Sequence, residues 1–169
     1  MRPTTDQLLA SLQSSLADMV VPHVEDRWAR YVCNAMDLVL EHLRRRAELE
    51  GPALAADDAD MRSVLASLAA LTGEQQTPST AGSDWADLAT VVSCEVPPPA
   101  DDTLAAETAT NEQLRSQIIE VIRWADRQRP DNPDLEPVFD QLGHLVRRQV
   151  HRTEPIVEPL YMLFTPAGT

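Results

Sequence analysis

The sequence predicts an all-α protein, a helical bundle of about five helices folded as a single domain over residues 1–169. Apolar residues recur at intervals of three and four along most of the chain, which is the period of an amphipathic helix. An apolar content of 43% with 24% charged residues is ordinary for a globular chain, and a chain of this length buries roughly 70% of the surface it exposes when unfolded. Aromatic residues make up only 4%, so aliphatic side chains must fill the core.

The N-terminal helix is predicted to begin at Thr4, because Gln7 three residues later completes a capping-box pattern. Its apolar residues continue at helical spacing to Val20. Pro22 has no amide hydrogen to donate and restrains Val21 before it. The chain is therefore expected to turn at this point into an antiparallel second helix.

The second predicted helix contains residues 25–46, EDRWARYVCNAMDLVLEHLRRR, and is expected to stop where Gly51 is followed by Pro52. An apolar stripe runs along it, formed by Trp28, Tyr31, Val32, Ala35, Leu38, Val39 and Leu43. A polar row runs beside the stripe and contains Arg30, Asn34, Asp37 and Glu41. Either the first three of these hydrogen-bond one another at the edge of the bundle, or they form a polar patch that binds a partner.

Three consecutive arginines, Arg44, Arg45 and Arg46, close this segment. Near the C-terminus of a helix their charges favour the negative end of the dipole, and they can pair with Glu41 and Glu48. The alternative interpretation is an anion-binding site that contacts the phosphate groups of an acyl-CoA.

A third helix is predicted over residues 58–72, where apolar residues recur at helical spacing: Met61, Val64, Leu65, Leu68 and Leu71. Residues 73–110 then form an acidic, proline-containing insertion, with a polar linker at its start and the extended segment PPPADD near its end. Between these, Ser83 is expected to cap a short helix. That helix either docks on the bundle or is an inserted interaction segment.

The negative charge of the chain is concentrated in its middle. From Ala47 to Glu112 there are 13 acidic residues and one basic residue, Arg62, whereas the flanks share the other 14 acids and 13 arginines. Because a nucleic-acid footprint requires a basic face, nucleic-acid binding is not expected. The acidic middle favours solubility, with attraction of a basic protein partner as the alternative.

Two further helices are predicted toward the C-terminus. The fourth begins at Thr110, where Gln113 repeats the capping-box spacing. Its inward-facing residues are expected to be Leu114, Ile118, Val121, Ile122 and Ala125. The fifth covers residues 135–151, with Pro137 tolerated in its first turn, and its apolar face contains Leu135, Val138, Leu142, Leu145, Val146 and Val150.

Residues 154–169 are expected to form an extended apolar tail, because prolines at 155, 159 and 166 disfavour a regular helix. Its apolar residues include Leu160, Tyr161 and Phe164, which are candidate partner-binding residues. An apolar tail in water promotes association, so it either lies along the chain's own bundle or docks on another subunit. The second alternative leaves a homo-oligomer open.

No motif in the chain points to catalysis or to a metal. Asp140 and His144 are four residues apart, but carboxylate-bridged sites in bundles need a Glu-x-x-His motif on each of two helices. The sequence has no GxSxG motif, no glycine-rich phosphate loop and no lysine. No catalytic residue, metal site or cofactor is predicted, and an enzyme is the less favoured interpretation.

Neither the cysteines nor the N-terminus points to secretion. Cys33 and Cys94 lie far apart in the sequence and outside any CxxC pattern, so both are expected to be reduced packing thiols. The N-terminal MRPTTDQLL lacks the long apolar region of a signal peptide, and no run approaches the ~18 apolar residues of a membrane span. A cytoplasmic protein without membrane contact is therefore expected.

Arg30, Val32 and Asn34, followed by Leu38, Val39 and Leu43, stand in the order RYVCNAMDLVLEHL after the segment VVPHVEDR. In this order they resemble a family of small bacterial all-helical proteins of unknown function, typically encoded beside kinases of the aminoglycoside-phosphotransferase type and acyl-CoA dehydrogenases. The segments TNEQLRSQIIEVIR and LEPVFDQLGHLVRRQV are similar to its two closing helices. The family has a Phe-His pair just before the arginine, whereas this chain has Arg27 and Trp28.

This resemblance implies a noncatalytic accessory or interaction subunit that binds and supports a partner enzyme. The implied partner is a phosphotransferase-like kinase acting on hydroxyacyl-CoA or related catabolic intermediates, or an acyl-CoA dehydrogenase. A bundle without catalytic motifs, with an apolar tail and an acidic segment, agrees with this in kind. The alternative is a small helical ligand-binding or hydrolytic protein that acts on an acyl-CoA-like anion through residues 44–46 or through the pair Asp140 and His144.

Overall fold

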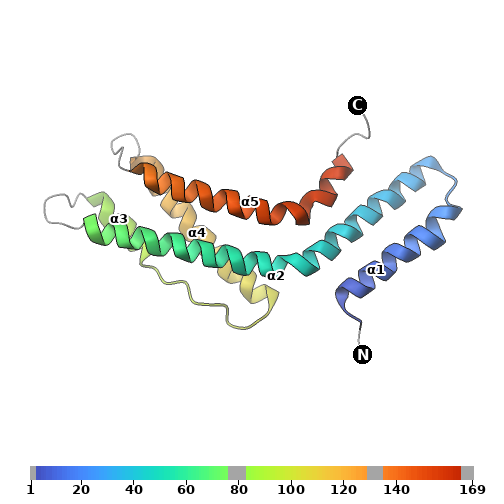
Figure 1. Cartoon of the computed structure of the whole chain (residues 1–169), viewed down its shortest axis with the longest axis horizontal. Coiled ribbons are helices and arrows are strands. Elements are labelled where there is room, and N and C mark those ends of the chain that lie inside the picture. Colours follow the sequence, from blue (N-terminus) through green and yellow to red (C-terminus); the bar gives the residue numbers. More distant parts are fainter. Residues whose placement is uncertain (1–2, 76–82, 129–134, 165–169) are drawn as a thin grey trace. The chain divides into compact units, whose positions relative to one another are not determined.

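Five α-helices account for most of the residues that the structure describes. The structure is a computed structural model and describes residues 3–75, 83–128 and 135–164. The helices are α1 (Thr5–Ser15), α2 (Arg27–Gln75), α3 (Ser83–Val92), α4 (Leu104–Gln128) and α5 (Glu136–Phe164), as Figure 1 shows. A π-helical turn (Leu16–Val20) and a 3₁₀ turn (Val21–His23) follow α1. The predicted all-α class is confirmed.

The chain divides into two compact units. Unit 1 contains Met1–Ala53 and Val150–Thr169, and unit 2 contains Leu54–Gln149. Both long helices, α2 and α5, contribute to each unit. The expectation of one domain over the whole chain stays a prediction.

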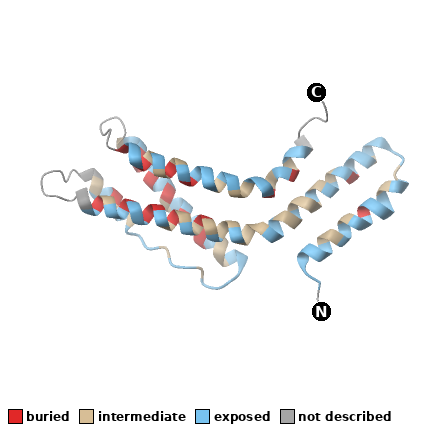
Figure 2. Ribbon diagram, in the orientation of Figure 1, coloured by how far each residue is buried: buried red, intermediate tan, exposed pale blue. Residues whose placement is uncertain are grey.

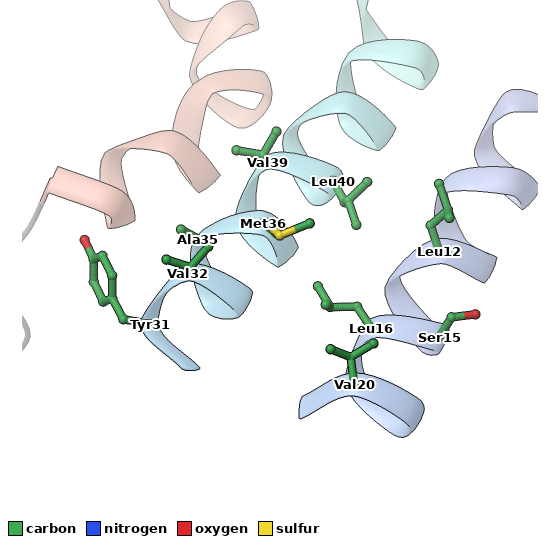
Figure 3. Close-up of a pocket in the computed structure, with 10 residues that line it drawn as sticks. All are labelled: Leu12, Ser15, Leu16, Val20, Tyr31, Val32, Ala35, Met36, Val39 and Leu40. Carbon is green, nitrogen blue, oxygen red and sulfur yellow. The ribbon is translucent and has the colours of Figure 1, made fainter. Parts of the chain in front are cut away.

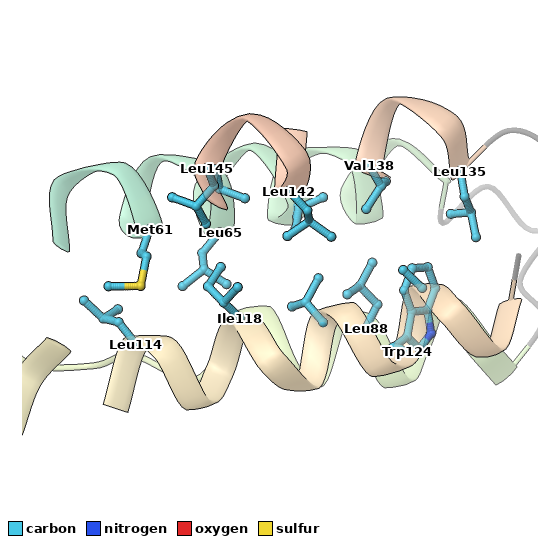
Figure 4. Close-up of a cluster of buried hydrophobic side chains, with 14 residues drawn as sticks. Met61, Leu65, Leu88, Leu114, Ile118, Trp124, Leu135, Val138, Leu142 and Leu145 are labelled. Carbon is cyan, nitrogen blue, oxygen red and sulfur yellow. The ribbon is translucent and has the colours of Figure 1, made fainter. Parts of the chain in front are cut away.

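Unit 2 has a closed apolar core, drawn in Figure 4. It is built from α2, α3, α4 and α5, with fully buried residues such as Leu68, Leu88, Val121 and Leu145. The short helix α3 packs on this core, and its Trp85 lies against Trp124 of α4 with ring centroids 5.3 Å apart. Of the two interpretations of this helix, docking on the bundle is the one that the structure agrees with.

Unit 1 has much less core. In its described residues, those that are buried are Leu16, Cys33, Ile156 and Pro159. Most of the exposed large apolar side chains of the described chain belong to this unit, and Figure 2 shows α1 and the first part of α2 largely as exposed or intermediate. The apolar stripe predicted on the second helix is therefore present, but most of its larger side chains are not covered.

The predicted end of the second helix at Gly51 and Pro52 is wrong. α2 runs for 49 residues with Pro52 inside it, so the second and third predicted helices are one helix. A proline in a helix interior removes one backbone hydrogen bond, here the one to the carbonyl of Glu48, and costs roughly 3 kcal/mol. Packed residues on both sides of Pro52 offset this cost, namely the ion pairs of residues 44–46 and the core residues from Met61 onward.

The predicted extended tail is also wrong over the residues that the structure describes. α5 continues to Phe164 with Pro155 and Pro159 inside it. Residues 165–169 of the predicted tail, and the side chain of Phe164, lie outside the described part. The physical reason for the continuation is a set of donors on α2, described below.

The capping prediction is confirmed at one of the two helix starts, those of α1 and α4, whose cap side chains the structure describes; the side chain of Ser83, the third predicted cap, lies outside the described part. At α1, the Thr4 hydroxyl accepts from the Gln7 amide, and the Gln7 side chain accepts from the Thr4 amide, so the predicted capping box is confirmed. At α4 the prediction is wrong, because Thr110 is buried inside a helix that begins at Leu104. The hydroxyl of Thr103 accepts from the Ala106 amide and caps α4 instead. Three residues expected to face inward, Ile122, Val146 and Val150, are exposed.

Candidate functional site

The arginines of residues 44–46 are paired with carboxylates of the same chain. Arg44 binds Asp6 of α1 at 2.9 Å and Glu41 at 3.0 Å. Arg45 binds Glu41 at 2.8 Å and Glu158 of α5 at 2.6 Å. Because Glu41 binds both arginines, these five residues form one chain of ion pairs that joins α1, α2 and α5.

These pairs leave the three guanidinium groups poorly placed to bind an external anion. Hydrogen bonds from Arg45 to Glu41 and Glu158 raise the pKa of the Arg45 side chain, and the hydrogen bond from Arg46 to Glu50, 2.7 Å long, does the same for the pKa of Arg46. An acyl-CoA phosphate would have to compete with carboxylates that are already bound. The geometry agrees better with the structural interpretation of residues 44–46, although they lie within α2 and not at its end.

Two residues of α2 donate hydrogen bonds to backbone carbonyls of α5 close to its internal prolines. Pro159 has no amide hydrogen, so the carbonyl of Pro155, four residues earlier, loses its helical donor. Arg45 Nη1 donates to that carbonyl at 3.0 Å. The next carbonyl, of Ile156, lies 2.7 Å from His42 Nδ1, which is the donor in this pair. Arg45 thus replaces the donor that the Pro155 carbonyl loses, and His42 adds a second bond from α2 one residue further along α5.

The polar row of α2 does not form one hydrogen-bonded network. Arg30 Nη2 donates to the Val24 carbonyl at 2.7 Å, and Asp37 accepts from Gln13 Nε2 of α1 at 3.1 Å. Asn34 lies between them and is exposed. Of the predicted partner-binding residues, Arg30 and Asn34 therefore lie on an open surface, whereas Asp37 also helps to hold α1.

The other predicted partner-binding residues lie near the end of α5. Leu160 is half-buried, and Tyr161 is exposed together with its neighbour Met162. Both Leu160 and Tyr161 belong to unit 1, as do Arg30 and Asn34.

The apolar surface of unit 1 is hollowed into a groove between α1 and α2. The groove has a volume of about 560 Å³. Figure 3 shows Leu12, Leu16 and Val20 approaching it from the α1 side, and Val32, Met36 and Leu40 from α2. We call the exposed large apolar residues of this region the apolar face; they are Leu8, Leu12, Met19, Val20, Trp28, Tyr31, Val32, Met36, Val39 and Leu43.

The apolar face and the polar row lie on opposite sides of α2. Arg30 and Val39 are nine residues apart, as are Asn34 and Leu43, and nine residues make about two and a half turns of an α-helix. The two flanks of α2 are occupied by helices: Asp37 and Arg44 bind α1, and Arg45 binds α5. Within unit 1, α2 thus lies between α1 and the end of α5, and it has one apolar side and one polar side (Figure 1).

Sequence reasoning missed this groove because it assigned α2 one apolar stripe. Met36 and Leu40 were outside that stripe, yet both line the groove. Together with Val32 and Val39 they make the apolar surface of α2 wider than one neighbouring helix covers. The width of the apolar surface of α2 was the feature of the sequence from which the groove could have been predicted.

Polar side chains that line a cavity in unit 2 are bonded to backbone carbonyls. A second cavity of about 390 Å³ there is lined in part by Arg62, Cys94 and Gln117. Arg62 donates to the Val96 and Pro97 carbonyls, and Gln117 donates to those of Val91 and Cys94, so these side chains fasten the segment after α3.

The carboxylates of the middle of α2 are also engaged. Buried Asp57 pairs with Arg115 at 3.3 Å, Asp58 accepts from Asn111 at 2.7 Å, and Asp60 pairs with Arg148 at 3.0 Å. This acidic run lies in the interior of α2 and fastens α4 and α5.

In the described parts of the chain, no three histidine, cysteine or acidic side chains come together as a metal site would require. His144 lies 3.4 Å from Arg147, and His151 lies 3.6 Å from Glu154. Across the same described helices, none combines the length and the apolar content of a membrane span. No known family, curated protein or solved structure matches this chain.

Proposed function

We propose that this chain is a noncatalytic interaction subunit that binds and supports a partner enzyme in the cytoplasm. The family resemblance suggests the partner: a phosphotransferase-type kinase acting on hydroxyacyl-CoA or a related catabolic intermediate. The observation that carries the proposal is that α2 leaves two surfaces open in unit 1, a polar one with Arg30 and Asn34 and an apolar one on the opposite side, so that an enzyme has an exposed surface to bind.

The state of the polar residues supports the same proposal. Most of the arginines and acids of residues 41–60 are engaged in ion pairs and hydrogen bonds within the chain, so they hold helices together. A catalytic site needs a positioned acid, base or nucleophile beside a pocket. The lining of the larger cavity is almost entirely aliphatic, with the hydroxyl groups of Ser15 and Tyr31 as its polar groups.

The alternative, a ligand-binding or hydrolytic protein acting on an acyl-CoA-like anion, has one favourable observation. The volume of the groove, about 560 Å³, is in the range of small-molecule sites. Such sites also carry a few polar groups that fix the ligand, and the arginines of residues 44–46 are already paired. Calorimetric titration with an acyl-CoA separates the alternatives, since only the ligand-binding protein gives heat.

Co-purification tests the proposed function. The tagged chain is co-expressed with the untagged phosphotransferase-type kinase of the same organism, and the expected result is a complex of the two. Kinase activity in the presence and absence of the chain then measures support. Recovery of the chain alone, together with kinase activity that is the same without it, would contradict the proposal.

A further inference from the structure

The apolar face of unit 1 is large enough to form a stable interface. Its ten exposed side chains present on the order of 1,000 Å², more than the ~800 Å² that a standard interface takes from each partner. It also exceeds the roughly 300–600 Å² of the largest apolar patch on a typical monomer. At one end, Trp28 and Tyr31 are stacked with centroids 5.4 Å apart, and Trp28 is 71% exposed. Trp and Tyr are among the residues that most often anchor interfaces.

The charges of unit 1 present only a small obstacle to a partner of the same kind. Unit 1 has ten acidic residues and seven arginines, a net charge of −3, whereas unit 2 has 17 acidic residues and seven arginines, a net charge of −10. Two copies that meet through unit 1 therefore bring together the nearly neutral part of each chain. The ion pairs of Arg44, Arg45 and Arg46 are closed within the chain, so the polar neighbours of the face demand no oppositely charged partner.

We infer that the apolar face binds a second copy of this chain, so that the two copies form a dimer through unit 1. In a twofold dimer the same patch on each copy meets its equivalent. An apolar patch can pack against its own copy, whereas a patch that carried charges of one sign would repel it. The groove between α1 and α2 is then filled by apolar side chains of the other copy. This goes beyond the proposed function, because it concerns the pure chain and requires no enzyme.

The arrangement leaves the other side of α2 available. Arg30 and Asn34 lie opposite the apolar face, so an enzyme that binds the polar row would not compete with the second copy.

Light scattering coupled to gel filtration tests the inference on the full chain. The wild type is expected to have about twice the monomer mass of 18.7 kDa, with a fraction of dimer that rises between roughly 1 and 100 µM. The dimer should persist in about 0.5 M NaCl, since an apolar interface is not weakened by screening. Met36→Glu, at a half-exposed position of the groove, should raise the dimer dissociation constant at least about tenfold.

Ile119→Glu is the matched control. Ile119 is 46% exposed, close to the 52% of Met36, but it belongs to α4 in unit 2. This variant should dimerise like the wild type. If Met36→Glu does not fold, as judged by circular dichroism, Trp28→Ser replaces it at a position with less structural role.

Three results would overturn the inference. The first is a wild-type monomer at every concentration. The second is a dimer that both face variants leave intact, which would place the interface elsewhere. The third is a monomeric chain whose complex with the kinase is lost in Met36→Glu, in which case the face binds the enzyme and the proposed function survives. Loss of kinase binding with an intact dimer would instead contradict only the proposed function.

Discussion

Arg45 donates a hydrogen bond to the carbonyl of Pro155, with Nη1 and the oxygen 3.0 Å apart, and that carbonyl is the one that Pro159 leaves without a helical donor. The same guanidinium binds Glu158 of α5 and Glu41 of its own helix. A single side chain of α2 thus satisfies the backbone of α5 and fixes its position. These contacts with α2 therefore stabilise the last turns of α5.

The first prediction is that Arg45→Ala destabilises the end of α5 and that Pro159→Ala partly rescues it. The alanine at 159 restores an amide that can donate to the Pro155 carbonyl, so it should help more in the Arg45→Ala background than in the wild type. Chemical unfolding of the wild type, both single variants and the double variant measures this coupling. Arg46→Ala is the control, because Arg46 pairs only with Glu50 one turn away on α2 among its described partners, and a smaller loss is expected. Strictly additive effects of the two substitutions would contradict the role of Arg45.

This contact also explains why the sequence misled at the prolines. A helix prediction weighs Pro155 and Pro159 against their neighbours in the chain, whereas the compensating donor is 110 residues away. The helix end predicted at Pro52 was wrong for the same reason, because residues on both sides of Pro52 contact other helices that are distant in the sequence. The core of unit 2 could be predicted, because helical periodicity alone placed residues such as Leu68 and Leu145 correctly in it.

The candidate site could be predicted only in part. The sequence left Arg30 and Asn34 either as part of a hydrogen-bonded network or as an open polar patch, and both residues are exposed. It could not indicate which apolar stripe lacks a partner, because a covered stripe and a bare one have the same spacing. Leu12 and Val32 show this, since both repeat like core residues yet line an open groove.

The second prediction concerns the core of unit 2. Leu145 is fully buried, so Leu145→Ala should lower the free energy of unfolding by about 2–5 kcal/mol through the lost burial and the cavity left behind. Val146 is the next residue along α5 but is 47% exposed, and Val146→Ala should cost under about 0.5 kcal/mol. Urea unfolding of both variants checks the difference. Equal losses of unfolding free energy in the two variants would contradict the placement of Leu145 inside the core and of Val146 outside it.

The third prediction concerns pH and the start of α4. The hydroxyl and the amide of Thr103 donate to Asp101, and these hydrogen bonds lower the pKa of the Asp101 carboxyl from its ordinary value of 3.8. A carboxyl with a lowered pKa in the folded state stabilises the protein above its unfolded-state pKa, and this is lost as the pH falls through the folded-state value. Thermal unfolding should therefore separate the wild type from Asp101→Asn at neutral pH, and the gap should close below pH 3.8.

Asp102→Asn is the control for this experiment, because the hydrogen bonds from Thr103 go to Asp101. A smaller gap at neutral pH is expected for it. A gap for Asp101→Asn that stays constant down to the acid limit would show that the charge of this carboxyl does not contribute.

The fourth prediction separates the two sides of α2. Asn34 is exposed on the polar row, opposite the apolar face, so Asn34→Ala should weaken the complex with the kinase and leave the dimer unchanged. Its thermal midpoint should stay within about 2 °C of the wild type, because exposed substitutions usually cost under about 0.5 kcal/mol. Met36→Glu should have the opposite pattern, with loss of the dimer and retention of the kinase. Titration of the kinase with each variant measures kinase binding, and light scattering measures the dimer. A large loss of stability in Asn34→Ala with intact kinase binding would mean that the polar row serves folding and not the interaction.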